Sequence, residues 1–213
     1  MLAWLVDLIL HLDRHLVELL AHYPLWIYPI LFAVIFAETG LVVTPFLPGD
    51  SLLFAVGALA ALDTSGTLGA PLASLTLGTA AVLGNIVNYS IGRAIGPPAF
   101  SGRYRLLKVA YLRRTEDFFR RHGGVAILLS RFIPIIRTCA PFVAGIARMP
   151  YGRFLAYNLA GGFGWVLLFV WGGYLFGNIP LVKRHFGLVT LLIIALSLLP
   201  LAGVLRKRPA HTA

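Results

Sequence analysis

The sequence predicts an all-α polytopic membrane protein, in which an inverted repeat of two broken re-entrant hairpins is combined with spanning helices and interfacial amphipathic helices. Of its 213 residues, 59% are hydrophobic and 12% are charged, whereas roughly a quarter of the residues of a soluble domain are charged. Several apolar stretches reach the roughly 20 residues that a helix needs to cross the hydrocarbon layer. Two of these stretches are interrupted by proline and glycine in corresponding halves of the chain. Residues 1–213 are therefore predicted to form a single membrane domain.

The predicted elements follow one another with short polar breaks. Residues 1–22 place a polar side chain at every third or fourth position, which predicts an interfacial amphipathic helix. His11 and His15 lie four residues apart, but no other metal-binding side chain clusters with them, so no metal site is predicted. In chain order, the further elements are a first broken hairpin (23–62), a spanning helix (75–96), a basic cytoplasmic amphipathic stretch (97–122), a second broken hairpin (125–149) and two spanning helices (153–177 and 187–205).

Both hairpins are interrupted by residues that end helices. Pro48 and Gly49 interrupt the first, and Pro134 and Pro141 interrupt the second. Proline removes a backbone donor, and non-helical backbone at membrane depth is tolerated only inside protein or beside water. Paired interrupted segments in two halves of a chain indicate a transporter with inverted repeats. We therefore expect the hairpins to enter the membrane from opposite faces, with these four residues at tips that meet near its middle.

The basic residues predict the orientation in the membrane. The formal net charge is +10, and lysine and arginine concentrate in residues 97–122 and at the C-terminus, whereas residues 63–69 contain neither. Because cytoplasmic loops carry an excess of lysine and arginine, the basic stretch and the C-terminus are predicted to be cytoplasmic and residues 63–69 to lie opposite. A basic run with interleaved aromatic residues would also suit nucleic acid. Its position between two membrane segments favours a lipid surface instead, so no nucleic-acid partner is predicted.

Four ionisable residues lie within the broken hairpins away from their ends, namely Glu38, Asp50, Arg131 and Arg137. A charge at the bilayer centre costs at least about 3 kcal/mol, so these residues must pair or line a wet cavity. One interpretation is that they form structural ion pairs. The other is functional: Arg131 and Arg137 bind a phosphate head group through their planar guanidinium groups, while Glu38 or Asp50 carries a proton or pairs with an arginine. The sequence does not distinguish between the two acids.

Further polar side chains on the predicted spanning helices are candidates for lining a polar cleft between the hairpins. They are Asn85, Tyr89, Arg93 and Asn158.

The sequence predicts no enzyme and no resident cofactor. A membrane phosphatase would act on similar lipids, but Ser51 and Ser130 have no nearby histidine to serve as a base, and no His-Glu-x-x-His motif occurs. Cys139 is the only cysteine, which excludes an intramolecular disulfide and a site with several cysteines.

The same residues carry a family resemblance. Residues 120–165 contain Arg131-Phe132-x-Pro134-x-x-Arg137 and the pair Ala144-Gly145, and the first half contains Glu38, Pro48-Gly49-Asp50, Gly84-Asn85 and Tyr89-x-x-Gly92-Arg93. In these motifs the chain resembles the DedA family of bacterial membrane proteins, which is similar to the VTT-domain lipid scramblases. The resemblance covers most of the chain and implies functional acids at Glu38 and Asp50 and functional arginines at Arg131 and Arg137. It departs at Asn85, where many relatives have aspartate.

The resemblance implies a lipid-moving function in the bacterial inner membrane. The expected partners are protons and a lipid with a phosphate head group, above all undecaprenyl phosphate, moved between leaflets with the proton motive force as energy source. A phospholipid scramblase and a proton-coupled transporter of a small ion or solute are the alternatives. The sequence leaves the oligomeric state open, and a homo-oligomer is compatible with it.

Overall fold

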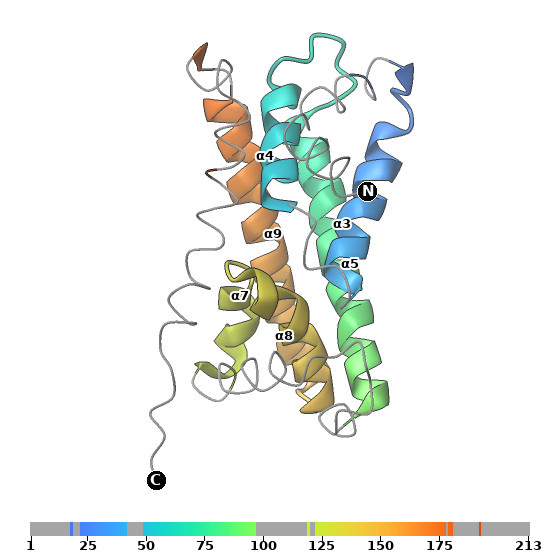
Figure 1. Cartoon of the computed structure of the whole chain (residues 1–213), viewed down its shortest axis with the longest axis vertical. Helices are drawn as coiled ribbons and strands as arrows, with labels where there is room; N and C mark the ends of the chain where they lie inside the picture. Colours follow the sequence, from blue (N-terminus) through green and yellow to red (C-terminus); the bar gives the residue numbers. More distant parts are fainter. Residues whose placement is uncertain are drawn as a thin grey trace.

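Helices joined by turns make up the described part of the chain. The computed structural model describes residues 18, 22–41, 49–96, 119, 122–177, 179, 180 and 192, and these residues include no strand. Its elements are α3 (Ile27–Gly40), α4 (Gly49–Ala60), α5 (Ala70–Ile95), the 3₁₀ turn η2 (Gly123–Val125), α7 (Ala126–Ser130), α8 (Pro134–Ile146) and α9 (Tyr151–Phe176) (Figure 1). The predicted all-α class is confirmed.

Two helices, α5 and α9, are long and apolar enough to cross a membrane. Each has 26 residues, which corresponds to a length of about 39 Å at 1.5 Å per residue. Both begin earlier than predicted. α5 starts at Ala70 because Pro71 occupies the first turn, where its missing N–H removes no helical hydrogen bond. α9 starts at Tyr151, directly after Pro150.

Two pairs of shorter helices lie on either side of the predicted breaks. α3 and α4 flank residues 41–48, and α7 and α8 flank Arg131–Ile133. Ile133 is extended (φ −124°, ψ 103°), as the residue before a proline usually is, because the pyrrolidine ring disfavours the helical conformation there. Pro134 is then the first residue of α8.

The prediction that Pro141 lies at a hairpin tip is wrong. Pro141 is buried inside α8. Proline cannot donate to the carbonyl four residues earlier, but neighbouring helices and side chains can stabilise such a position in a membrane helix. α8 packs along α5 and continues as a helix through Pro141.

Several predicted elements fall outside the described residues. They are residues 1–22, 97–122 and 187–205, of which the structure describes only Glu18, His22, Phe119, His122 and Leu192. The predicted tip residue Pro48 also lies outside the described residues. These elements stay predictions.

The short helices pack crosswise on the long ones. α4 lies against α9, and α8 lies against α5, so the helix that follows each break packs on the long helix of the other half. The helices before the breaks stay within their own half, α3 on α5 and α7 on α9. Figure 1 shows α4 towards one end of the molecule and α7 and α8 towards the other. The two halves are therefore interlocked.

Glycines allow the crosswise helices to touch through their backbones. A Cβ added at Gly57 of α4 would collide with the carbonyl oxygen of Val170, and one at Gly173 of α9 would collide with that of Phe54. The other pair of helices repeats the arrangement: a Cβ at Gly92 of α5 would meet the carbonyl of Phe142, and one at Gly145 of α8 would meet that of Tyr89. Small residues at such crossings allow close approach in the absence of a strong hydrophobic drive.

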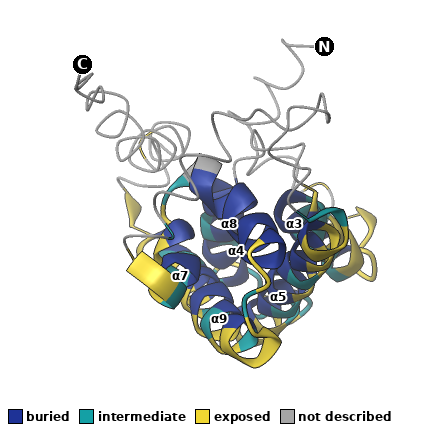
Figure 2. Ribbon diagram, turned by 90° about the horizontal axis from the view of Figure 1, so that it is seen from below, coloured by how far each residue is buried: buried dark blue, intermediate teal, exposed yellow. Residues whose placement is uncertain are grey.

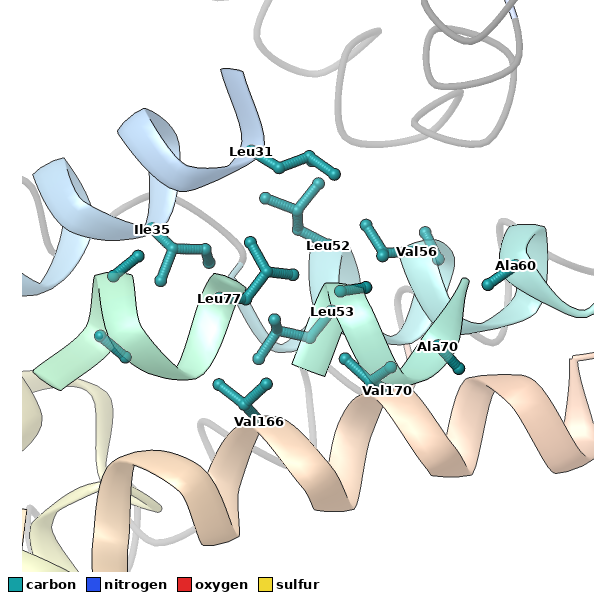
Figure 3. Close-up of a cluster of buried hydrophobic side chains, with 14 of the residues drawn as sticks. Leu31, Ile35, Leu52, Leu53, Val56, Ala60, Ala70, Leu77, Val166 and Val170 are labelled. Atoms are coloured by element: carbon teal, nitrogen blue, oxygen red, sulfur yellow. The ribbon is translucent and has the colours of Figure 1, made fainter. Parts of the chain in front are cut away.

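Apolar side chains fill the centre of the bundle and also cover its outside. Leu31 and Ile35 of α3, Leu52, Leu53 and Val56 of α4, Leu77 of α5, and Val166 and Val170 of α9 converge in the main cluster (Figure 3). In Figure 2 the ribbon segments coloured as buried lie mainly towards the centre of the bundle, and those coloured as exposed lie mainly at its edge. Large apolar side chains are also exposed on the outer faces of α5 and α9, among them Leu75, Leu83, Leu168 and Leu175. Outer faces of this kind suit contact with lipid.

Two adjacent glycines of α9 provide a matched test of the crosswise packing. Gly173→Ala should lower the unfolding temperature in detergent, since overpacking of this kind costs about 1–3 kcal/mol and the colliding group is the backbone of α4. Gly172→Ala meets nothing within 4 Å and should leave stability unchanged or raise it by up to about 1 kcal/mol through helix propensity. Equal unfolding temperatures of the two variants would contradict the backbone contact between α4 and α9.

Candidate functional site

The four ionisable residues predicted inside the hairpins are all buried and lie at helix ends beside the breaks. Glu38 is in the last turn of α3, Asp50 is the second residue of α4, Arg131 directly follows α7, and Arg137 is in the first turn of α8. Their exposed fractions are 1%, 8%, 1% and 5% respectively. The charged residues beside the two breaks therefore lie in the interior of the bundle.

Arg137 pairs with both acids at once. Its Nη1 lies 2.7 Å from Oδ1 of Asp50, and its Nη2 lies 2.6 Å from Oε1 of Glu38. One guanidinium group thus joins three helices, α3, α4 and α8, which come from both halves of the chain. Charge-assisted hydrogen bonds of this kind are about twice as strong as neutral ones.

Gly49 makes room for this ion pair. The carboxylate of Glu38 lies against the Cα of Gly49, where any Cβ would collide with it. The structure thus places Gly49 at the first position of α4, beside the acid, and the glycine gives Glu38 access to Arg137.

Arg131 has a different environment. Its Nη2 donates to Oδ1 of Asn158 at 2.9 Å, while Nε and Nη1 have no hydrogen-bond partner in the described part of the protein. No carboxylate of that part makes an ion pair with Arg131, because both Glu38 and Asp50 are paired with Arg137. Arg131 is therefore a buried cation whose described partner is neutral.

Asn85 and the carbonyl of Val82 hold Asn158 in place beside Arg131. Oδ1 of Asn158 also accepts from Nδ2 of Asn85 at 2.8 Å, and its own Nδ2 donates to the carbonyl of Val82 at 3.0 Å. Asn85 and Asn158 thus reach the charge cluster from α5 and α9. Gly162 leaves space for the guanidinium group of Arg131, since a Cβ at this position would lie 3.2 Å from Nη2 of Arg131.

Two residues of the cluster were missed by sequence reasoning. Trp165 of α9, 1% exposed, donates from Nε1 to Oδ1 of Asp50 at 2.8 Å, and its ring centroid lies 5.1 Å from Cζ of Arg137 and 5.8 Å from Cζ of Arg131. Asn88 donates to the carbonyls of Thr39 and Thr138, at 3.1 and 2.8 Å, and so joins α3 to α8. A signal was present, because Asn88 follows Asn85 by three residues and Trp165 follows Asn158 by seven, spacings that place each pair on one helix face.

The structure does not bring Tyr89 and Arg93 to the charge cluster. Tyr89 donates to the carbonyl of Met149 and stacks on Phe154, with a centroid distance of 4.3 Å. Arg93 is exposed and donates to the hydroxyl of Tyr89 at 3.1 Å. These two residues tie the C-terminal part of α5 to the connection between α8 and α9.

The arrangement can hold an anion at Arg131 and can exchange partners at Arg137. It combines two acids, two arginines, three asparagines and an indole in the interior of the bundle. Among the described residues, no three histidine, cysteine, aspartate or glutamate side chains are grouped as metal ligands.

Comparison with known proteins gives consistent matches. The VTT domain family matches residues 47–175. The chain is 50% identical over 201 residues to "Protein DedA" of Escherichia coli K12, which covers 94% of this chain and 91% of that protein. It is 40% identical over 179 residues to an uncharacterized membrane protein of Mycobacterium tuberculosis H37Rv, covering 82% and 76% of the two chains. It is 38% identical over 160 residues to "Inner membrane protein YqjA" of Escherichia coli K12, covering 75% and 71%. No solved structure is significantly similar to the chain.

The unequal partners of the two arginines predict unequal effects on stability. Arg137→Met should destabilise the protein by about 3–5 kcal/mol, because it leaves two buried carboxylates without their shared cation. Arg131→Met should cost much less, since Asn158 keeps its bond from Asn85 and no acid loses a partner. Thermal unfolding of both purified variants in detergent measures the difference.

A triple variant provides the control for this experiment. Adding Glu38→Gln and Asp50→Asn to Arg137→Met removes the uncompensated charges and should recover part of the lost stability. Equal destabilisation by the two arginine variants would show that the Arg137 ion pairs do not organise the fold.

Proposed function

This chain belongs to the DedA family of membrane proteins, which carry the VTT domain, and we propose that it moves a lipid with a phosphate head group between the leaflets of the membrane. Undecaprenyl phosphate is the lipid we favour, with the proton motive force as energy source and without a resident cofactor or bond-breaking chemistry. The observation that carries the proposal is the environment of Arg131, a buried cation with two unpartnered nitrogens within the described part of the chain.

Arg131 is suited to a phosphate group. A buried cation is unfavourable unless an anion or a set of acceptors compensates it. Asn158 supplies one neutral acceptor, so a phosphate oxygen would supply both the missing acceptors and the missing negative charge. Guanidinium groups match phosphate oxygens in geometry and form charge-assisted hydrogen bonds with them.

Glu38 and Asp50 are suited to couple the movement to protons. Both carboxylates hold Arg137. A proton that reaches either acid would weaken its bond to Arg137 and free a guanidinium nitrogen for the phosphate. Loss of the proton would restore the ion pair and release the head group. In this scheme the phosphate passes between Arg131 and Arg137 while the apolar chain of the lipid stays outside the bundle.

The architecture supports this path. In our proposal the two broken segments are re-entrant hairpins that enter from opposite faces, and the contact between Asp50 and Arg137 lies near their tips. The exposed leucines of α5 and α9 would face the acyl chains.

Charge at the two ends of the bundle supports an orientation. The loop between α4 and α5 contains Asp63, whose carboxylate accepts from the backbone N–H of Leu68 and from Ser65. These bonds hold the pKa of Asp63 below its usual range, so the loop stays negative. Arg93, Arg148 and Arg153 lie at the other ends of α5 and α9. By the positive-inside rule we propose that this basic end and the C-terminus are cytoplasmic, in the bacterial inner membrane.

A liposome assay tests the proposal. Purified protein should move undecaprenyl phosphate between leaflets, and faster with an imposed pH gradient. Arg131→Ala should lower the initial rate at least about tenfold, since a hydrogen bond to a charged group contributes about 1.5–3 kcal/mol. Arg131→Lys should recover only part of the rate because it lacks the planar fork. Arg93→Ala removes an exposed arginine outside the cluster and serves as control.

The same assay separates the alternatives. Movement of phospholipids without preference for undecaprenyl phosphate and without effect of the gradient would indicate a scramblase. Uptake of a small ion or solute with no lipid movement would indicate a solute transporter. A normal rate of lipid movement in Arg131→Ala would overturn the phosphate site.

The acids should determine the response to pH. Glu38→Gln and Asp50→Asn keep the shape of each side chain and remove its titration. The variant that lacks the proton carrier should transport at a rate that no longer changes with the pH gradient, while the other variant should keep some response. Rates across a series of internal and external pH values measure this, with the unfolding temperature of each variant as a check on folding. An unchanged gradient response in both folded variants would exclude these acids as proton carriers.

A further inference from the structure

Trp165 contacts three of the four buried charges. Its indole N–H donates to Oδ1 of Asp50, the same oxygen that accepts from Nη1 of Arg137. Its ring lies within 6 Å of the guanidinium carbons of both Arg131 and Arg137, the range in which a cation is attracted to the face of a tryptophan. This side chain is therefore placed to act on the acid and on both arginines together.

We propose that Trp165 is the positioning residue of the phosphate site, which sets the places of Arg131 and Arg137 and holds Asp50 when Arg137 leaves it. The inference rests on the proposed function. The substrate class it implies is a phosphate-bearing lipid whose head group is handed from one arginine to the other.

The face of the Trp165 ring interacts with the two arginines. Two buried guanidinium groups repel each other in a medium of low dielectric constant. An aromatic face attracts each of them without neutralising either, so it keeps both charges available to an anion. An acid in the same position would form an ion pair and compete with the substrate. The ring itself is packed edge-on against Phe169, with centroids 6.4 Å apart and planes at 70°.

The indole N–H of Trp165 donates a hydrogen bond to Asp50. In the structure Oδ1 of Asp50 accepts from Trp165 and from Arg137. When Arg137 turns to a phosphate, Asp50 loses that donor but keeps the one from Trp165. Without the indole N–H, this step would remove both of these bonds from a buried carboxylate oxygen, and the loss of hydrogen bonds to a buried charged group is strongly unfavourable.

Two substitutions separate these roles. Trp165→Phe keeps an aromatic face but removes the donor to Asp50, so the maximal rate of transport should fall about tenfold while the half-saturating concentration of undecaprenyl phosphate changes little. Trp165→Leu also removes the aromatic face, so the half-saturating concentration should rise at least about tenfold. A residue that only filled space would show no such division between rate and affinity.

Trp171 provides the matched control on the same helix. It is 38% exposed and its ring pairs with Tyr174, so Trp171→Phe and Trp171→Leu should transport like the unmodified protein. If Trp165→Leu or Trp165→Phe transports with unchanged rate and affinity while Arg131→Ala is defective, the positioning role of Trp165 is overturned and the proposed function still stands. A fully active Arg131→Ala would overturn the proposed function instead.

Folding is checked independently of transport. If Trp165→Leu does not yield folded protein, Trp165→Phe decides the matter alone, because its reduced maximal rate with retained affinity is expected only from loss of the N–H. Equal loss of rate and affinity in a folded Trp165→Phe protein would overturn the inference.

Discussion

The ion pairs between Arg137 and the two acids are the interaction on which the rest of the structure depends. They join the end of α3, the start of α4 and the start of α8 in the interior of the bundle. Charges of this kind are tolerated in a membrane only if their partners are held in place. The helix ends that carry these charges must therefore lie close together. Both breaks in the helices lie next to these ends.

The crosswise packing follows from the same requirement. Asp50 and Arg137 belong to different halves, so the helices that carry them must reach past the long helix of their own half. α4 does so by packing on α9, and α8 does so by packing on α5. Glycines at these crossings bring the backbones into contact, which compensates for the weak hydrophobic drive between helices in lipid. Backbone contact thus supplies the rigidity that a buried charge cluster needs.

Sequence reasoning predicted the all-α fold, the two long helices and the four buried charges, because each rests on a property of local sequence such as apolar length or an ionisable residue at membrane depth. It did not predict which charges pair, since pairing depends on tertiary distance. It wrongly predicted that Pro141 interrupts the chain at a hairpin tip, because a proline within a packed membrane helix need not end the helix. It missed Trp165, although this residue follows Asn158 by seven positions on the same helix face, because a tryptophan in an apolar helix does not by itself indicate a polar contact such as the one with Asp50.

The two arginines differ in their partners, and this asymmetry would allow a balanced cluster to attract the anion that we propose as its ligand. Two acids and two arginines have no net charge, yet both acids bind Arg137, and Arg131 has Asn158 and the face of Trp165 instead. If each acid held its own arginine, an incoming phosphate would have to displace a carboxylate before binding. In the observed distribution Arg131 has no carboxylate partner in the described part of the chain, so a phosphate that reached it would not have to displace one. In the proposed mechanism Arg137 would become available only when its acids release it, and this would separate binding of the head group from its onward movement.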